Sequence, residues 1–340
     1  MRGVAAALAW VSLVIAGEGC SRPAAGTAGA AGAGSGAEAG AGANAEAGAG
    51  AGANAGAGPS AASDAGPALP VGATPCPATA TGPTCVRFAS NEDAFRWVLA
   101  HEPAILAIGE AHAQKGTEAI TSATKRFTET MVSLLENRAS DLLVEAWAGD
   151  PKCQKEVKQV ASAQAPVKQA QAQTNPNEYV TLGTRAKALG VTPHLLRPSC
   201  DDYAGLADAG ADVIPASLSL IKRLTQSDAT RLFERNQTAK NGRMVVTYGG
   251  AMHNDLAPSD ALRKYSFGPE LTTATGGRYV ELDMIVPEYV KKTDVWEKLP
   301  WYASFQADTG PRDKPVLYRL GDRSFVLVFA SSPAAPAPLR

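Results

Sequence analysis

The chain has 340 residues, with 32 Lys or Arg, 33 Asp or Glu and 4 His, so its formal net charge is -1 at pH 7. This near-neutral balance provides no electrostatic attraction for nucleic acid, and the sequence has neither a basic arm nor a ladder of aromatic side chains for stacking on bases. The composition therefore excludes nucleic acid as an expected partner. It leaves room for one folded domain of about 250 residues behind a low-complexity N-terminal region.

The N-terminus reads MRGVAAALAWVSLVIAGEGCSR, which has the parts of an export signal. Arg2 supplies the basic region, and the apolar run Val4–Ala16 is too short to span a bilayer as a mature helix. The small residue Gly19 precedes Cys20, and GEGC resembles the processing box of bacterial lipoproteins. We therefore predict a signal peptide over 1–20 and export to the periplasm or outer membrane. Cys20 would be lipidated and hold the protein at the membrane, with plain secretion as the alternative.

Ala and Gly make up most of the stretch from 23 to 75. Such a segment buries too little apolar surface to offset the entropy lost on ordering. The Gly residues between the Ala residues also disfavour a helix. We predict a disordered tether over 21–85, followed by one folded domain over 86–335.

Four cysteines remain besides Cys20, and an even number in an oxidising compartment indicates disulfide bonds. Cys76 and Cys85 bracket PATATGPT, a Pro- and Gly-containing segment that can close a small loop. We predict that these two residues pair, which leaves Cys153 to pair with Cys200 by elimination. The alternative for that second pair is two free, buried thiols.

The first elements of the domain alternate between helical and strand patterns. SNEDAFRWVLAHE, residues 90–102, opens with an N-cap Ser or Asn and places apolar residues on one face, which predicts a helix. AILAIG, residues 104–109, is a short apolar run typical of a strand covered on both faces. Apolar residues at helical spacing then predict a helix over 117–137, and DLLVEAW, residues 141–147, predicts a second buried strand.

The later elements continue this alternation. Further predicted helices cover 151–165, 175–190 and 213–240, the last broken near 226–228. Further predicted strands cover 190–196, 243–250, 278–286, 314–320 and 323–330. Strand–helix alternation predicts an α/β fold with a central, largely parallel but mixed sheet flanked by helices. The last two strands would form a hairpin at its antiparallel edge.

Two predicted strands end in the same short motif. Gly109-Glu110-Ala111-His112 follows the strand 104–109, and Gly250-Ala251-Met252-His253 ends the strand 243–250. With 33 Gly in 340 residues, a Gly three positions before a given His arises by chance about one time in ten. Residues beyond the carboxyl ends of parallel strands line the ligand crevice of open α/β sheets, and Gly there permits a sharp turn. If the two strands are neighbours, we expect the two imidazoles to lie within about 8 Å of one another. The alternative is two hydrogen-bonded loop histidines.

Carboxylates accompany the two His residues. Glu110 lies inside the first motif, Glu118 follows it, and Glu145 ends the strand 141–147. Two neutral imidazoles with carboxylates form a site suited to Mn²⁺, Fe²⁺, Zn²⁺ or Co²⁺. Without a metal, the same groups could activate water by general-base catalysis. For Glu145 the alternative is a buried ion pair with an Arg such as Arg126 or Arg197.

At these residues the sequence resembles the Tiki superfamily, which joins Tiki and TraB-type proteins, haem-uptake lipoproteins of the ChaN type and erythromycin esterases. The signature of that superfamily is two Gly-x-x-His motifs with a Glu at the end of a strand between them, here Glu145. IGEAHAQKGTEA is also similar to the esterase and ChaN version of the first motif, although Ala113 stands where the esterases carry Gly. The resemblance spans about residues 104–285.

The motif and the resemblance lead to three hypotheses. In the first, His112, Glu145 and His253 bind a divalent metal in a hydrolase of peptide, ester or lactone bonds, and Glu110 or Glu145 moves the proton. In the second, a ChaN-like lipoprotein binds haem or iron without catalysis, with Tyr248 as a further iron ligand beside the two His residues. In the third, the domain is an interaction module. Three acidic residues around two His suit a hard or borderline cation better than a porphyrin, which favours the hydrolase.

The other two His residues are weaker candidates. His194 lies within the strand 190–196 and either reaches the same crevice or packs at the sheet edge. His101 ends a predicted helix, where an imidazole commonly caps carbonyl groups, so we assign it no function.

Overall fold

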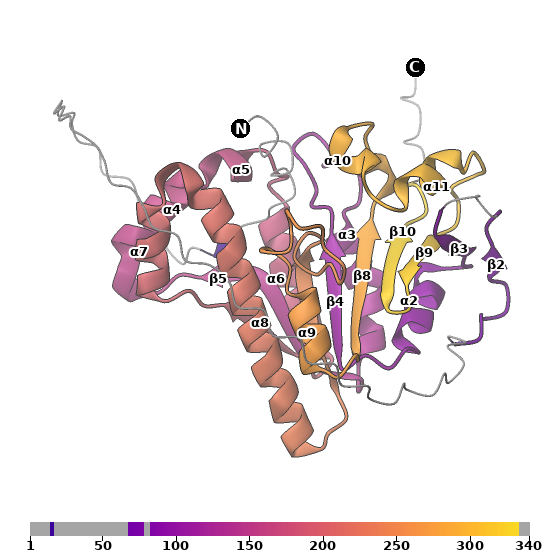
Figure 1. The fold of residues 1–340 in the computed structure, drawn as a ribbon, viewed down its shortest axis with the longest axis horizontal. Helices are drawn as coiled ribbons and strands as arrows, with labels where there is room; N and C mark the ends of the chain where they lie inside the picture. The colour runs from indigo at the N-terminus through magenta and orange to yellow at the C-terminus, as the bar shows by residue number, and fades with distance from the viewer. Residues whose placement is uncertain (1–13, 17–66, 78–81, 333–340) are drawn as a thin grey trace, which may run out of the picture. The chain divides into compact units, whose positions relative to one another are not determined.

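The computed structural model describes residues 14–16, 67–77 and 82–332 (Figure 1). Its centre is a row of four parallel strands, which lie side by side in the order β5 (Ala139–Ala148), β7 (Met244–Gly250), β4 (Ile105–Glu110) and β8 (Tyr279–Ile285). The sheet is mixed but largely parallel, and helices cover it. The α/β fold expected from strand–helix alternation is therefore confirmed.

Further strands extend the sheet on both sides of this row. Beyond β8 come β10 (Ser324–Val328), β9 (Val316–Gly321), β3 (Thr84–Arg87) and β2 (Thr74–Pro75). Beyond β5, both β6 (Thr192–Leu196) and β1 (Val14–Ala16) pair with β5 in parallel. The β9–β10 hairpin is antiparallel as predicted, but it does not form the edge, because β3 and β2 pair beyond it.

Helices cover both faces of the sheet (Figure 1). One face carries α2 (Asn91–Leu99), α3 (Ala123–Arg126) and α6 (Asn175–Ala188). The other face carries α4 (Gln154–Ala163), α7 (Cys200–Asp208), α8 (Val213–Ala239) and α9 (Gly268–Ala274). Along β4, Leu106 and Ile108 pack on the first face, and Ile105 and Ala107 pack on the second, as the two-residue period of a strand requires. This two-sided burial explains why the strand reads as a continuous apolar run.

Short elements complete the fold. They are α5 (Ala165–Gln169), α10 (Asp294–Glu297), α11 (Tyr302–Ala307) and the turns η4 (Pro151–Cys153), η5 (Gly210–Asp212) and η6 (Pro287–Tyr289). Trp296 and Trp301 come from the α10–α11 region and pack against residues of β9 and β10 such as Tyr318 and Val326. This separate apolar cluster buries the hairpin.

Two helices differ from their predicted form. The helix predicted over 117–137 starts only at α3, after the N-cap Ser122, and continues as a π-turn (η2, Phe127–Met131) and a 3-10 turn (η3, Val132–Leu135). The break predicted near 226–228 is absent, because α8 runs without interruption through these residues. Its buried positions Thr225, Ala229 and Leu232 keep the helical spacing across the expected break, so packing outweighs the local polar sequence.

The folded domain begins earlier than predicted. In the 67–77 segment, β2 pairs with β3, Ala73 packs against the core, and the Trp97 Nε1–H group donates to the carbonyl oxygen of Pro67 at 3.0 Å. The tether boundary placed at residue 85 is therefore wrong, since main-chain pairing can hold a segment that buries little apolar surface. Residues 21–66 and 78–81 of the predicted tether and the predicted lipidation site Cys20 lie outside the described residues.

The two predicted disulfides have different outcomes. Cys76 and Cys85 form a disulfide bond between the end of β2 and β3, with their Cα atoms 5.4 Å apart. Cys153 and Cys200 are free thiols, so the predicted bond between them is not present. The Cys153 thiol instead donates to the backbone carbonyl oxygen of Asp150 at 3.6 Å, within the turn that starts α4. The prediction by elimination correctly placed Cys153 beside Cys200, but it was wrong about a bond between them.

Each of the described helices, taken singly, is too short or too polar to cross a bilayer. Only α7 together with the helical stretch Gly210–Ala239 reaches the required length and composition, and these two are bent by 117° relative to one another.

Candidate active site

The predicted site residues come from three consecutive strands of the sheet. Glu145 lies near the end of β5, His253 follows β7, and His112 follows β4. Since these strands are parallel neighbours, their carboxyl ends meet at one edge. The expectation that the two motif-bearing strands are adjacent is confirmed, and Gly109 pairs in register with Gly249.

Glycines at the strand ends create the space for this site. A Cβ atom on Gly249 would overlap the carboxylate of Glu145 and stand 2.8 Å from its Cβ. A Cβ atom on Gly109 would stand 2.6 Å from the side-chain oxygen of Asn254. Glycine at these two positions therefore allows polar side chains from the neighbouring strand and loop to lie directly against the backbone.

Glu110 holds His112 in place. One carboxylate oxygen accepts from His112 Nδ1 at 2.7 Å and from the Tyr179 hydroxyl at 3.0 Å. The other oxygen accepts from the hydroxyls of Thr124 at 2.6 Å and Tyr248 at 3.0 Å. Burial alone would raise the pKa of Glu110, but His112 and the hydroxyl donors outweigh it and hold the pKa below its ordinary value. Glu110 is thus a buried anion that fixes the ring of His112 with Nε2 facing away.

His253 is anchored in the same manner by a different acceptor. Its Nδ1 lies 2.8 Å from the carbonyl oxygen of Tyr265, which assigns the proton to Nδ1. Burial lowers the pKa of His253 to about 4, so the ring is neutral at pH 7 and Nε2 carries a free lone pair. This Nε2 lies 3.9 Å from Oε1 of Glu145.

Glu145 is held by one oxygen and leaves the other free. Its Oε2 accepts the backbone N–H of Gly250 at 2.8 Å. Burial raises the pKa of Glu145 to about 8, and the charge of Glu110 adds to the shift. The ion pair with Arg126 that was the alternative for Glu145 is not formed, because Arg126 donates to the carbonyl oxygen of Ala330 at 2.6 Å and to the Ser332 hydroxyl. Within the described part of the chain, no Arg pairs with Glu145.

Each of the three predicted ligands has one buried atom without a hydrogen-bond partner among the described residues: His112 Nε2, His253 Nε2 and Glu145 Oε1. In metal sites a ligating His commonly donates its second ring N–H to a carboxylate or backbone carbonyl, as both His residues do here. The donor set therefore fits a divalent ion. His253 Nε2 and Glu145 Oε1 lie 3.9 Å apart. The ligand atoms of all three residues, however, do not lie within 4.8 Å of one another.

The space beside His253 and Glu145 is small. A cavity of about 10 Å³ lies against these two side chains, which is the room needed by one water molecule or one ion. A porphyrin does not fit there. Tyr248 is 1% exposed and donates its proton to Glu110, and burial raises its pKa well above the ordinary value. Tyr248 is therefore a hydrogen-bond donor to Glu110 in this structure, and its role as an iron ligand stays a prediction.

The remaining candidates lie away from this edge or have structural partners. Glu118 is exposed, so it is not part of the site. His194 pairs with Asp141 at 2.7 Å, where β6 meets β5. Nδ1 of His101 lies 3.1 Å from the Trp97 carbonyl oxygen at the end of α2, consistent with its predicted structural role.

Sequence reasoning missed several residues that shape the site. Tyr179 of α6 and Thr124 of α3 donate to Glu110, and Tyr265 supplies the carbonyl oxygen that orients His253. None of them belongs to a motif, so only the packed structure identifies them. Asn254 is different, because its place directly after the second motif was a usable signal.

Comparisons with known proteins add little. No family model matches the chain, and no curated protein matches it. Among solved structures, the type III effector HopBA1 is similar with a TM-score of 0.36 and 11% sequence identity, over 72% of this chain and 96% of that chain. A likeness at this level supports no conclusion about fold or function.

Proposed function

We propose that this protein is a metal-dependent hydrolase of the bacterial envelope, with His112, His253 and Glu145 as the residues that hold a divalent ion. One observation carries the proposal: each of the three side chains is anchored by one polar atom and leaves its other polar atom buried and unpartnered. The export signal and the lipid anchor at Cys20 belong to the same proposal and rest on the sequence.

The chemistry follows from the donor set. Two imidazoles and a carboxylate suit Mn²⁺, Fe²⁺, Co²⁺ or Zn²⁺. When bound, such an ion polarises a substrate carbonyl and lowers the pKa of a bound water. Both oxygens of Glu110 are occupied by donors, so Glu110 acts by holding His112. Glu145 keeps one free oxygen, Oε1, which either binds the ion or takes the proton of a water molecule.

The proposed substrate pocket lies next to the second motif. Ala251 and Met252, the two residues between Gly250 and His253, line a pocket of about 340 Å³ whose other walls are mostly apolar. A volume of this size suits a small molecule or a short peptide segment. Because the cavity beside His253 is itself only about 10 Å³, we expect the turn after β7 to move when substrate binds.

The test uses the full chain purified without chelator. Its metal content would be measured, together with hydrolysis of chromogenic ester, lactone and peptide probes in the presence of Mn²⁺, Fe²⁺, Co²⁺ or Zn²⁺. We expect stoichiometric metal in the wild type and its loss, with loss of activity, in His112→Ala and His253→Ala. Glu145→Gln separates two roles, since retained metal without activity identifies a proton acceptor and lost metal identifies a ligand.

The matched control is His194→Gln, which removes an imidazole outside the site and should retain both metal and activity. A wild type that binds none of the four ions and cleaves no probe would contradict the proposal. Stoichiometric hemin binding with a Soret band would favour the haem-binding alternative instead.

A further inference from the structure

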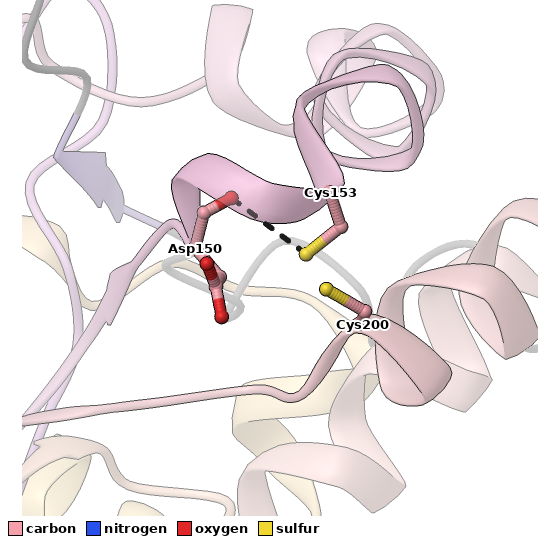
Figure 2. A group of neighbouring side chains, drawn as sticks. All are labelled: Asp150, Cys153 and Cys200. Atoms are coloured by element: carbon pink, nitrogen blue, oxygen red, sulfur yellow. Dashed lines mark hydrogen bonds between the residues drawn. The ribbon is translucent and has the colours of Figure 1, made fainter.

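A second group of ligand side chains lies at the carboxyl ends of β5 and β6, outside the site described above. Asp150 follows β5, Cys153 is the residue before α4, and Cys200 is the first residue of α7 (Figure 2). Segments that are separated in sequence thus meet at one point. Figure 2 shows the two sulfur atoms facing one another between the starts of α4 and α7, with Asp150 beside them.

The spacing of these atoms suits a single ion. One ligand atom from each of the three residues lies within 4.8 Å of the other two. In a tetrahedral zinc site with Zn–S bonds of about 2.3 Å, two sulfur ligands stand roughly 3.8 Å apart. Small side-chain rotations would therefore close the group around a cation. The His/Glu site does not meet this criterion as it stands.

A buried polar group next to these residues lacks a partner. Tyr203 of α7 is fully buried, and its hydroxyl has no hydrogen-bond partner among the described residues. Tyr203 and Cys153 belong to the same apolar cluster, and Cys200 packs against that cluster. An unpartnered buried hydroxyl costs about 1–3 kcal/mol, so packing alone does not account for Tyr203 at this position.

The local electrostatics also favour a cation between the thiols. Both thiols stand at helix N-termini, where partial positive charge supports a thiolate once its proton is lost. Two adjacent thiolates with a carboxylate then need a divalent cation to balance them.

We propose that Asp150, Cys153 and Cys200 form a binding site for a thiophilic divalent cation such as Zn²⁺, which joins the start of α4 to the start of α7. Binding releases the two thiol protons to solvent and forms two metal–sulfur bonds and one metal–oxygen bond. Asp150 and Cys200 are half-buried, so the ion can enter from solvent and keep a water ligand in its fourth position.

The test measures Zn²⁺ and Co²⁺ binding to the full chain under conditions that reduce Cys153 and Cys200. We expect stoichiometric binding with a thiolate-to-Co²⁺ charge-transfer band in the near ultraviolet. Cys153→Ser and Cys200→Ser should abolish this band, and Asp150→Asn should weaken Zn²⁺ binding about tenfold or more. The band reports sulfur ligands only, so it is independent of the His/Glu site and should persist in His253→Ala.

The matched control is Asp201→Asn, which removes an acidic group next to Cys200 in the first turn of α7 and should leave binding unchanged. Circular dichroism of each metal-free variant checks that the fold is retained. The proposal is overturned if the reduced wild type gives no charge-transfer band, or if both Ser variants bind as the wild type does. It is equally overturned if the two cysteines are a disulfide that resists reduction in the folded protein.

Discussion

Glu145 and His253 each use one polar atom to fix their position and leave the other buried without a partner among the described residues. A buried polar atom without a hydrogen bond costs about 1–3 kcal/mol. With His112 Nε2, three such atoms lie on consecutive strands of one sheet edge, so the cost is concentrated at one place. Stability alone would favour apolar residues here, which is why we assign the edge to ligand binding.

The sequence could predict this site only in part. The motif residues were identifiable because they lie at or just after the ends of apolar strands. Polar residues there, such as His112, Glu145 and His253, have no packing role, and Gly109 permits the turn that follows. The helix residue Tyr179 was not identifiable, because its contact with Glu110 depends on how α6 packs against the sheet. A single sequence contains no signal for such a distant contact.

The close approach of Glu145 to Gly249 gives a first prediction. Gly249→Ala should displace the Glu145 carboxylate from the Gly250 N–H, because the new Cβ would overlap it. We expect loss of metal binding and of hydrolysis, with the apolar core retained. Gly183→Ala in α6 is the control, since its Cβ would meet Pro193 at an ordinary 3.5 Å and Ala is preferred in helices. Unchanged metal affinity in Gly249→Ala would contradict the role given to Glu145.

A second prediction concerns pH and Asp283 of β8. Burial raises the pKa of Asp283 from 3.8 to about 7. The hydrogen bond from Asn254 lowers this pKa, and the negative charge of Asp255 raises it further. A raised folded-state pKa contributes stability that is full below pH 4 and is lost as pH rises through 7. The shift corresponds to at most about 4 kcal/mol, less with screening because Asp283 is partly exposed.

Asp283→Asn should remove this loss. In chelator-treated protein we expect the Tm of the variant to exceed that of the wild type at pH 8 and to approach it at pH 4. Asp322→Asn, at an exposed hairpin position, should follow the wild-type pH profile. Parallel pH profiles for Asp283→Asn and the wild type would show that Asp283 is already ionised in the folded state at pH 4.

At the scale of the elements, the central strands were predictable and the additions at the sheet edge were not. Strands such as β4 and β7 are continuous apolar runs between turns, and this pattern reports burial on both faces directly. The two residues of β2, by contrast, are exposed and follow an Ala/Gly-rich stretch. Their place in the sheet depends on main-chain hydrogen bonds to β3 and on the Cys76–Cys85 bond, neither of which leaves a hydrophobic pattern.

The Cys76–Cys85 bond should therefore stabilise this edge. The bridged residues are 9 positions apart. Closing a loop of that length removes conformational entropy from the unfolded chain, which raises its free energy by about 3 kcal/mol at 25 °C. We expect the double variant Cys76→Ser/Cys85→Ser to lose up to that much free energy of unfolding in urea denaturation. Cys153→Ser leaves the bond intact and should lose less. A double variant as stable as the wild type would mean that β2 contributes nothing to the fold.

At the scale of the whole molecule, β5 links the two proposed metal sites. Glu145 near its end belongs to the His/Glu site, and Asp150 just beyond it belongs to the thiol site. The two sites share no ligand, and their other members come from different elements: the ends of β7 and β4 for one, the turn before α4 and the start of α7 for the other. The carboxyl edge of the sheet therefore presents two donor sets of different chemistry, nitrogen and oxygen in one, sulfur and oxygen in the other.

This separation predicts that the two sites stabilise the fold independently. A ligand at a free concentration of 100 Kd stabilises the state that binds it by about 2.7 kcal/mol. Adding Zn²⁺ to the metal-free wild type should thus raise its Tm, and His253→Ala and Cys200→Ser should each lose part of that rise. Sites without shared partners add within about 0.5 kcal/mol, so the double variant should lose the sum of the two parts. Differential scanning calorimetry of the four proteins with and without Zn²⁺ measures this sum. A double variant that loses clearly more or less than the sum would show that β5 couples the two sites, and a rise that persists in full would place the bound zinc elsewhere.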